Sequence, residues 1–259
     1  MNEDNLIKYY NKFNEDKRFD SRGGYIEYIT SMKYIKEYIK EFDNPKILDV
    51  GAGTGAYSVP LVQEGYNVSA VELVKHNLRY IESKSNKVKV YQGNALDLSR
   101  FKDESFDLVL LFGPMYHLIS EKEKIIALRE SVRVAKKKGI VMVAYIMNDY
   151  ALITHGFKDN NIIESINSNL VDRNYHITPK ETDLYSYVRL DDINYYNTKI
   201  DADRIKIITP DGPTNYIRNI INKMDDATFN KYIDYHFATC ERLDMLGAAG
   251  HTLDILRKK

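Results

Sequence analysis

The chain has 259 residues, which suits one large domain or one domain carrying a substantial insertion. Lys plus Arg and Asp plus Glu each number 37, so the formal net charge is zero, which argues against a large phosphate-binding surface but leaves room for a local basic patch. We expect a cytoplasmic protein with no membrane partner, for three reasons. The chain has a lone cysteine, and no apolar run approaches the roughly 20 residues that cross a bilayer. Its first residues are polar and lack a signal-peptide pattern.

The first predicted element is a helix over residues 25–42, where apolar residues recur at three- and four-residue spacing before Asn44-Pro45 ends the pattern. Strand and helix patterns then alternate along the chain. Strands are predicted at 46–50, 67–72, 87–91, 106–112 and 140–146, and helices at 56–64 and 74–83. This alternation indicates βαβ units and a mostly parallel sheet.

A further helix before the fifth strand is marked by its ends. Ser120 and Glu123 have the spacing of a capping box at its start. The lysines at 136–138 are predicted to close it, because cations at a helix C-terminus interact favourably with the helix dipole.

The alternation breaks after Asn148. It resumes in a helix at 190–196 and strands at 204–209 and 252–256, separated by insertions at about 149–185 and 212–248. We therefore expect a doubly wound α/β fold in three parts: an N-terminal helical segment (1–44), a core (45–148), and the remainder of the sheet with both insertions (149–259). The N-terminal segment and the insertions are predicted to cover the ligand edge of the sheet.

The strongest chemical signal is the run Asp49-Val50-Gly51-Ala52-Gly53-Thr54-Gly55, which follows an apolar strand and opens a helix. Glycines allow the backbone to approach a ligand closely and to adopt positive φ angles. The N-terminus of the following helix favours an anionic group such as a carboxylate. Asp49, at the end of the strand, could bind an ammonium group. Carboxylate and ammonium together describe the methionine part of S-adenosylmethionine (SAM).

Glu72 ends the second predicted strand, where a carboxylate can accept both hydroxyls of a ribose. A glycine loop followed by an acidic residue is also the pattern of nicotinamide and flavin dinucleotide folds, and a glycine turn can serve packing alone. Three features favour SAM: the charge of Asp49, the segment Gly93-Asn94-Ala95 after the third strand, and Phe112-Gly113-Pro114-Met115-Tyr116-His117 after the fourth.

As a set, D-V-G-A-G-T-G, V-E-L, G-N-A-L-D-L and F-D-L-V-L-L-F-G-P-M-Y-H-L resemble the motif series of class I SAM-dependent methyltransferases over residues 45–147. The whole chain also resembles a group of bacterial methyltransferase-domain proteins with the F-G-P-M-Y-H-L loop. These share an N-terminal motif, here Tyr9, Tyr10, Glu15, Asp16 and Arg18, and a Y-H-x-A-T-C-E-R segment near the end. The resemblance implies a Rossmann-like sheet of seven strands, the seventh antiparallel and paired with the sixth.

The resemblance also implies SAM as cofactor and S-adenosylhomocysteine (SAH) as product. The residues it assigns to cofactor binding are Asp49, Gly51, Ala52, Gly53 and Gly55 at the methionine end, Glu72 at the ribose, Leu73, Asn94 and Ala95 at the adenine, and Phe112 near the sulfonium. Many family members have Asp where this chain has Asn94. The amide oxygen of Asn94 can still accept a hydrogen bond from the adenine amino group.

Methyl transfer from a sulfonium is an in-line displacement that depends mainly on positioning and desolvation, and a base helps only where the acceptor must lose a proton. His117 is the candidate base, with hydrogen bonding to a loop carbonyl as the alternative. Tyr116 is a candidate to contact the reacting groups, since an aromatic ring can face the cationic donor. Tyr9, Tyr10 and Arg22 are candidate substrate-binding residues of a lid, with surface packing as the alternative.

The preferred hypothesis is methylation of a small molecule, supported by the neutral net charge and the cover-like insertions. RNA or protein methylation is the first alternative, although the loop Leu111-Phe112-Gly113-Pro114 lacks the N/D-P-P-Y/F motif of many nucleic-acid enzymes. A non-catalytic SAM-binding module is the second. No spaced Cys and His cluster predicts a metal, and the sequence does not indicate the acceptor atom or the oligomeric state.

Overall fold

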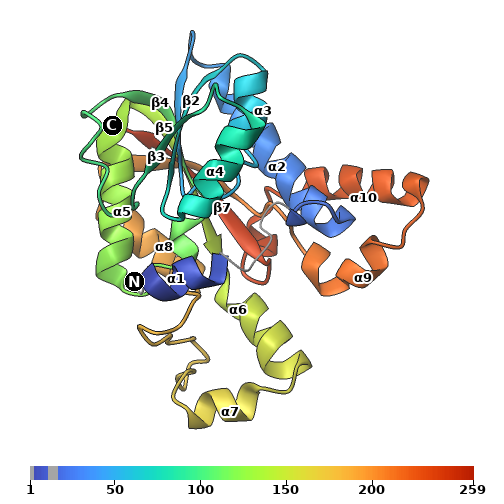
Figure 1. Ribbon diagram of the computed structural model, residues 1–259. Coiled ribbons are helices and arrows are strands. Elements are labelled where there is room, and N and C mark those ends of the chain that lie inside the picture. Colours follow the sequence, from blue (N-terminus) through green and yellow to red (C-terminus); the bar gives the residue numbers. More distant parts are fainter. Residues whose placement is uncertain (1–2, 11–16) are drawn as a thin grey trace.

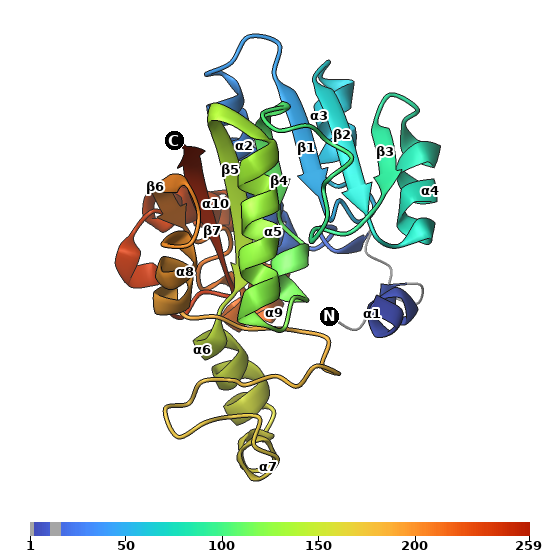
Figure 2. The same cartoon turned by 90° about the vertical axis from the view of Figure 1, so that its left-hand side faces the viewer.

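The computed structural model describes residues 3–10 and 17–259, which form a seven-stranded sheet with helices on both faces (Figures 1 and 2). The strands are β1 (Lys46–Val50), β2 (Asn67–Glu72), β3 (Lys89–Gln92), β4 (Phe106–Leu111), β5 (Ala135–Ile146), β6 (Ala202–Ile208) and β7 (His251–Lys258). Their order is β3-β2-β1-β4-β5-β7-β6. The strands from β3 to β5 are parallel, and β7 runs antiparallel between β5 and β6. The doubly wound topology predicted from the sequence is confirmed.

The helices predicted from the sequence are present, with ends that differ by a few residues. The helices are α1 (Glu3–Tyr10), α2 (Arg22–Ile39), α3 (Ser58–Gln63), α4 (Lys75–Lys84), α5 (Glu121–Val134), α6 (Asn148–Ala151), α7 (Ile162–Asn167), α8 (Leu190–Asn197), α9 (Arg218–Ile221) and α10 (Asp226–Thr239). Of these, α1, α6 and α7 were not predicted. Shorter turns are η2 (Pro114–Tyr116), the π-helical η3 (Leu152–Lys158), η4 (Thr214–Ile217) and η5 (Leu243–Met245). Within the described part of the chain, no helix is long and apolar enough to span a membrane.

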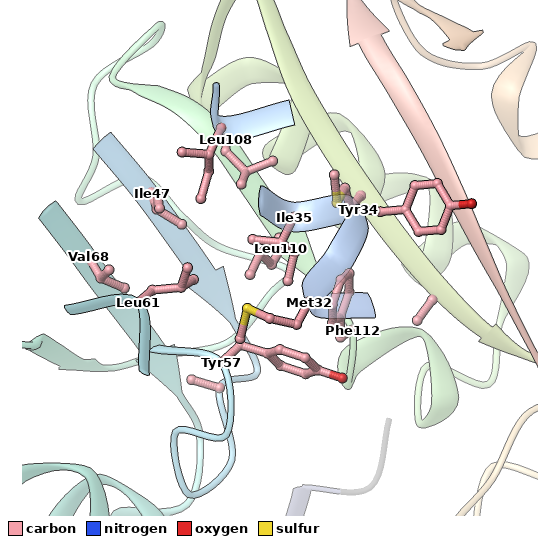
Figure 3. Close-up of a cluster of buried hydrophobic side chains, with 14 of the residues drawn as sticks. Met32, Tyr34, Ile35, Ile47, Tyr57, Leu61, Val68, Leu108, Leu110 and Phe112 are labelled. Carbon is pink, nitrogen blue, oxygen red and sulfur yellow. The ribbon is translucent and has the colours of Figure 1, made fainter. Parts of the chain in front are cut away.

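The core lies on both faces of the sheet, because successive side chains of a strand point to opposite sides. Ile47 of β1 packs with α2 and α3, whereas its neighbour Leu48 packs on the opposite face with α5 and α8. Figure 3 shows Met32 and Ile35 of α2 among the side chains that rise from β1 and β4. The central strand β4 is buried along its whole length, as its continuous apolar sequence predicts.

The helix α2 belongs to the core, which revises the interpretation of residues 1–44 as a cover. Tyr34 and Ile35 have no exposed surface, so the second half of α2 is a layer of the fold. Only the first half of α2, with Glu27 and Ser31, reaches the cavity described below. The covering role predicted for the N-terminal segment therefore falls on α1 and on this first half of α2.

The lysines at 136–138 do not end a helix, contrary to the sequence prediction. Helix α5 stops at Val134, and β5 already begins at Ala135. The ammonium of Lys258, from β7, donates instead to the carbonyl oxygens of Arg133 and Ala135, at 3.2 and 2.8 Å. A cation far away in the sequence thus occupies the position that the sequence pattern assigned to local lysines. The capping box of Ser120 and Glu123 is confirmed.

The two insertions occupy different places. The first contains α6, η3 and α7 and projects from the molecule beyond the carboxyl ends of the strands (Figure 2). The second contains η4, α9 and α10 and packs against α2, where Ile26, Ile221 and Phe229 form a small apolar cluster. This second insertion therefore supports α2 from the side away from the sheet (Figure 1).

Candidate functional site

A cavity crosses the carboxyl edge of the sheet from the end of β3 to the end of β6. Its first half is lined from the ends of β1, β2 and β3 by Asp49, Gly51, Ala52, Gly53, Thr54, Glu72, Leu73, Val74, Asn77, Gly93, Asn94 and Ala95. Its second half is lined by Tyr10, Arg18, Phe19, Glu27, Ser31, Tyr57, Phe112, Tyr116, His117, Ala144, Pro210 and Leu253, among others. This location outside the strand ends is the usual ligand site of a doubly wound sheet.

Gly55 is the one residue predicted to bind SAM that does not line this cavity. A Cβ atom on Gly55 would lie 2.9 Å from Val59 Cγ2 and 3.0 Å from Ile81 Cγ1, and the residue has a φ of +83°. Gly55 is therefore required where the loop packs against α3 and α4. For this position, the alternative interpretation of a glycine that serves packing fits the structure.

Gly51 brings the glycine loop against the loop that follows β4. Its φ is +74°, and an added Cβ would lie 2.5 Å from Pro114 Cδ. A Cβ on Gly113 would in turn lie 3.1 Å from the carbonyl oxygen of Gly51. Two predicted motifs that are far apart in the sequence thus pack directly together, and both need glycine to do so.

Asp49 is a buried acid at the middle of the cavity. Its exposed fraction is 1%, and its Oδ2 accepts a hydrogen bond from Ser58 Oγ at 2.5 Å. Burial raises the pKa of this carboxyl to about 6; the Ser58 hydrogen bond opposes the shift, and the nearby Glu72 adds to it. A ligand ammonium beside Asp49 would stabilise its ionised form.

Glu72, which was predicted to accept the hydroxyls of a ribose, holds the glycine loop closed. Its two carboxylate oxygens accept the backbone N–H groups of Gly53 and Val74, each at 2.8 Å. Burial raises the pKa of this carboxyl, while these hydrogen bonds act in the opposite direction. The amide of Asn77 also donates to Oε1, at a longer 3.5 Å, so Oε2 keeps a lone pair for a ligand hydroxyl and Oε1 can accept a second hydroxyl in place of Asn77.

Asn94 connects the β3 end of the cavity to α1. Its amide oxygen accepts the backbone N–H of Leu96 at 3.0 Å, and its amino group donates to Glu3 at 2.5 Å. The oxygen that was predicted to accept from adenine therefore already holds a local turn, and one lone pair remains for a ligand.

His117 is neutral and fixed by both ring nitrogens. Nδ1 lies 2.8 Å from the carbonyl oxygen of Leu184, which can only accept, so Nδ1 carries the proton. Nε2 then accepts from the hydroxyl of Tyr10, also at 2.8 Å. Burial lowers the pKa of His117 to about 4; the bond to Leu184 opposes this shift, and the charge of Arg18 adds to it. The carbonyl bond foreseen as the alternative role is present, and it leaves Nε2 as an acceptor at the cavity.

Lys124 is a buried residue that the sequence analysis missed. Its ammonium donates to the carbonyl oxygens of Leu118 and Ile119, at 2.5 and 3.1 Å, and to Ser186 Oγ at 2.7 Å. Burial lowers its pKa to about 8. Its spacing from Leu128 on one face of α5 was a usable signal, because that face is apolar and buried. Lys124 ties the loop after β4 to the end of the first insertion.

The sequence analysis named only Arg18, as a motif residue, from a second group of partly or fully buried charges. Arg18 Nη2 lies 2.6 Å from Glu27 Oε1, and both residues line the second half of the cavity. Behind them, His251 Nδ1 lies 2.7 Å from Asp211 Oδ2 and 4.0 Å from Glu27 Oε2. These four residues are distant in sequence and share no motif spacing, so only the fold brings them together.

The candidate lid residues have different positions. Tyr10 lines the cavity, whereas the hydroxyl of Tyr9 accepts from Tyr185 at 3.1 Å beside it. Arg22 does not line the cavity; its guanidinium binds the carbonyl of Met224 at 2.5 Å and the carboxylate of Asp226, which ties α2 to the second insertion. The motif residues Glu15 and Asp16 lie outside the described residues.

Neither insertion contributes a described residue to the cavity lining, so the covering role predicted for them is at most indirect. The first insertion reaches the site through its end, where Leu184 holds His117 and the N–H of Ser186 donates to Tyr116 O at 2.7 Å. The described residues contain no group of three or more His, Cys, Asp or Glu side chains arranged to hold a metal ion.

Residues 48–143, which supply β1 to β4 and most of β5, match the family model described as the methyltransferase domain. Residues 48–143 form a methyltransferase domain with the class I fold. Similar curated proteins include the ubiquinone biosynthesis O-methyltransferase of Rickettsia typhi, 28% identical over 125 residues, which are 47% of this chain and 48% of that protein. The glycine/sarcosine N-methyltransferase of Aphanothece halophytica is 30% identical over 126 residues, or 46% of this chain and 47% of that protein.

The chain spans about half the length of the curated relatives it matches, so the similarity concerns the methyltransferase domain. Solved structures match more of the chain. A SAM-dependent methyltransferase of Thermotoga maritima covers 99% of both chains with a TM-score of 0.58 and 15% identity. One from Methanosarcina mazei covers 87% of this chain and 96% of its own, with a TM-score of 0.57 and 16% identity. At identities of 15% and 16%, these matches show that the rest of the chain shares the fold of these structures, and they show nothing about its function.

Proposed function

We propose that this chain is an enzyme that transfers the methyl group of SAM to a small-molecule acceptor and releases SAH. The observation that carries the proposal is the single cavity whose halves differ in chemistry. The half over β1 to β3 has the buried acids and glycines that suit SAM. The half over β4 to β7 continues from it and is lined mostly by buried side chains. A donor and an acceptor would meet near Phe112, between the halves.

The residues of the first half fit the charge and hydrogen-bonding groups of SAM. Asp49 would hold the ammonium and Glu72 the ribose hydroxyls, because both carboxylates are buried and retain acceptor capacity. Gly51 and Gly53, with φ of +74° and +54°, would leave room for the methionine carboxylate near the start of α3. SAM supplies the activated methyl group, so the protein has to align the acceptor with it and exclude water.

The second half supports a small acceptor over RNA or protein. Glu27, Ser31, Tyr57, Tyr116 and His117 line it and are all at most 8% exposed, so a flat macromolecular surface would not reach them. The zero net charge offers no general attraction for nucleic acid. Two relatives of the domain are named for ubiquinone biosynthesis and for glycine and sarcosine. His117 would position the acceptor's surroundings and not take its proton, because the one lone pair of its Nε2 already accepts from the hydroxyl of Tyr10.

The test is calorimetric titration of the purified chain with SAM, SAH and NADH, repeated on Glu72→Ala and Gly53→Arg, with the exposed Glu82→Ala as the control. We expect saturable binding of SAM and SAH, at least about 100-fold weaker in both site variants and unchanged in the control. That factor corresponds to about 2.7 kcal/mol, within the range for two lost charge-assisted hydrogen bonds. Binding of NADH in place of SAM, or no binding by a folded chain, would overturn the proposal.

A further inference from the structure

The second half of the cavity contains a pair of opposite charges that the proposed SAM site does not use. Glu27 comes from the first half of α2 and is 7% exposed, and Arg18 comes from the segment just before this helix. Their side chains lie 2.6 Å apart. Both line the cavity on its β4 to β7 side, away from Glu72 and Asn94.

These two are the only ionised side chains among the described residues of that half. The other walls are aromatic or apolar, with Phe19, Tyr57 and Tyr116 around the pair. The guanidinium carbon of Arg18 lies 5.2 Å from the ring centre of Phe19 and 5.8 Å from that of Tyr116. A ligand that enters this space therefore meets one positive and one negative group on an otherwise uncharged wall.

The anchoring of α2 does not depend on this pair. Arg22 ties the start of the helix to the second insertion, and Lys36 ties its last turns to Glu64 at 2.6 Å, both outside the cavity. The pair is only partly buried, with side-chain exposures of 27% for Arg18 and 9% for Glu27, and desolvation and solvent screening offset much of its attraction. Its position against an open cavity is therefore better explained by a ligand than by folding.

The charged residues behind the pair contact each other and do not line the cavity. His251 lies between Glu27 and Asp211; burial lowers its pKa, but the two carboxylates outweigh burial and raise it above its ordinary value. Asp211 is fully buried and also accepts from Asn215 at 2.7 Å. Among the described residues, Arg18 and Glu27 are therefore the charges that a ligand in this half would meet.

We propose that the methyl acceptor is a zwitterion whose carboxylate binds Arg18 and whose amino group binds Glu27. A purely anionic or cationic ligand would match only one member of the pair, whereas a zwitterion replaces the direct pair with two charge-assisted contacts, one to each residue. The planar guanidinium suits a carboxylate, and the aromatic wall suits an ammonium group. The proposal rests on the proposed function and names its substrate class.

The transfer is balanced without a further reactant. The ammonium of the acceptor first gives a proton to the carboxylate of Glu27, which frees the nitrogen lone pair. This lone pair forms the new N–C bond while the C–S bond breaks, and the bonding electrons remain on sulfur, which gives neutral SAH. The product leaves as a methylated ammonium, and Glu27 returns its proton to water.

The experiment measures binding to the SAH-loaded protein and SAH release from SAM. The zwitterions are glycine, β-alanine and phenylalanine, and the analogues that lack one charge are ethylamine, phenethylamine, acetate and 3-phenylpropionate. We expect at least one zwitterion to bind and to be methylated, with each single-charge analogue at least about tenfold weaker. Glu27→Gln and Arg18→Gln should each raise the zwitterion KM at least about tenfold and change the SAM Kd less than about twofold. Glu64→Gln removes the exposed pair that Lys36 of the same helix makes with Glu64, and it should change neither the zwitterion KM nor the SAM Kd.

The outcomes separate the two proposals. If the protein binds SAM but no zwitterion binds its SAH complex, or if single-charge analogues are preferred, the zwitterion proposal is overturned and the methyltransferase proposal stands. If the folded protein does not bind SAM, both fall. Circular dichroism and the SAM Kd of each variant show whether it is folded, and a variant that loses SAM binding is replaced by Glu27→Asp or Arg18→Lys.

Discussion

The hydroxyl of Tyr10 lies 2.8 Å from Nε2 of His117, so the N-terminal helix α1 contacts the loop after β4 directly. The two rings also meet edge to face, with their centres 5.5 Å apart. Because Nδ1 of the same imidazole is bound to Leu184, three separate parts of the chain meet at this one side chain. Access to the second half of the cavity therefore involves α1, the loop after β4 and the first insertion.

The state of His117 can be tested through the pH dependence of turnover. Its pKa is lowered to about 4, so the imidazole is neutral throughout the range from pH 6 to 8. We expect no inflection in kcat from this residue near pH 6.5. Because Glu27 takes the proton of a zwitterionic acceptor and Tyr10 engages Nε2, His117→Ala should lower kcat much less than the about 100-fold typical of a lost general base. Tyr10→Phe keeps the ring contact and should have a still smaller effect. An inflection near pH 6.5 that His117→Gln abolishes would contradict this state.

SAM binding should depend on the ionisation of Asp49. The pKa of this carboxyl is about 6 in the folded chain, so it is protonated below that pH and loses its attraction for an ammonium. The apparent Kd for SAM should therefore rise below pH 6, by up to about tenfold for each pH unit. Titrations between pH 5 and 8 measure this. Asp49→Asn should bind weakly at pH 7.5 and show a flatter profile, and an equally steep profile in that variant would refute the role of Asp49.

The stability of the ligand-free chain should depend on the ionisation of Asp49 in the opposite direction: it should be greater when this carboxyl is protonated. Its pKa is raised in the folded state, so the folded chain without ligand holds the proton more tightly than the unfolded chain between about pH 4 and 6. Its contribution to the free energy of unfolding is therefore present at low pH and is lost as the pH rises through 6. Urea denaturation of wild type and Asp49→Asn across this window compares the two slopes, and the wild type should fall more steeply.

Two glycines with positive φ provide a matched pair for the packing of the glycine loop. Gly51 has a φ of +74° and meets Pro114, whereas Gly65 has a φ of +97° and open space around it. Gly65→Ala should cost only the backbone penalty of about 1–2 kcal/mol in the free energy of unfolding. Gly51→Ala should cost clearly more and should also weaken SAM binding. Denaturant unfolding checks both, and equal costs would mean that Pro114 moves aside freely.

Lys124 should be important for stability although it carries a buried charge. Lys124→Met leaves the carbonyls of Leu118 and Ile119 and the hydroxyl of Ser186 without their donor. We expect a loss of about 2–4 kcal/mol in the free energy of unfolding, since buried polar groups that lose a partner are costly. The exposed Lys122→Met on the same helix is the control. A loss no larger than that of the control would show that water replaces the ammonium without cost.

The lining of the first half of the cavity could be predicted from the sequence, and that of the second half largely could not. Asp49, Glu72 and Asn94 each follow a strand of a regular βαβ series, so local periodicity was enough to place them at one edge. Arg18 and Glu27 carry no such signal, because their meeting depends on where α2 packs. The prediction that the lysines at 136–138 end a helix was wrong for a related reason. These residues belong to β5, which begins at Ala135, and their pairing in the sheet is not visible in the local sequence.

The positions of the cavity-lining residues along the sequence have a consequence for how such a protein can change during evolution. Residues that line the first half of the cavity lie in one contiguous stretch, from Asp49 to Ala95, inside the segment that matches the family model. The second half draws many of its side chains from outside that segment, among them Arg18, Glu27, Pro210 and Leu253. Exchange or remodelling of the flanking segments can therefore alter what the domain accepts, while the inherited donor site remains intact.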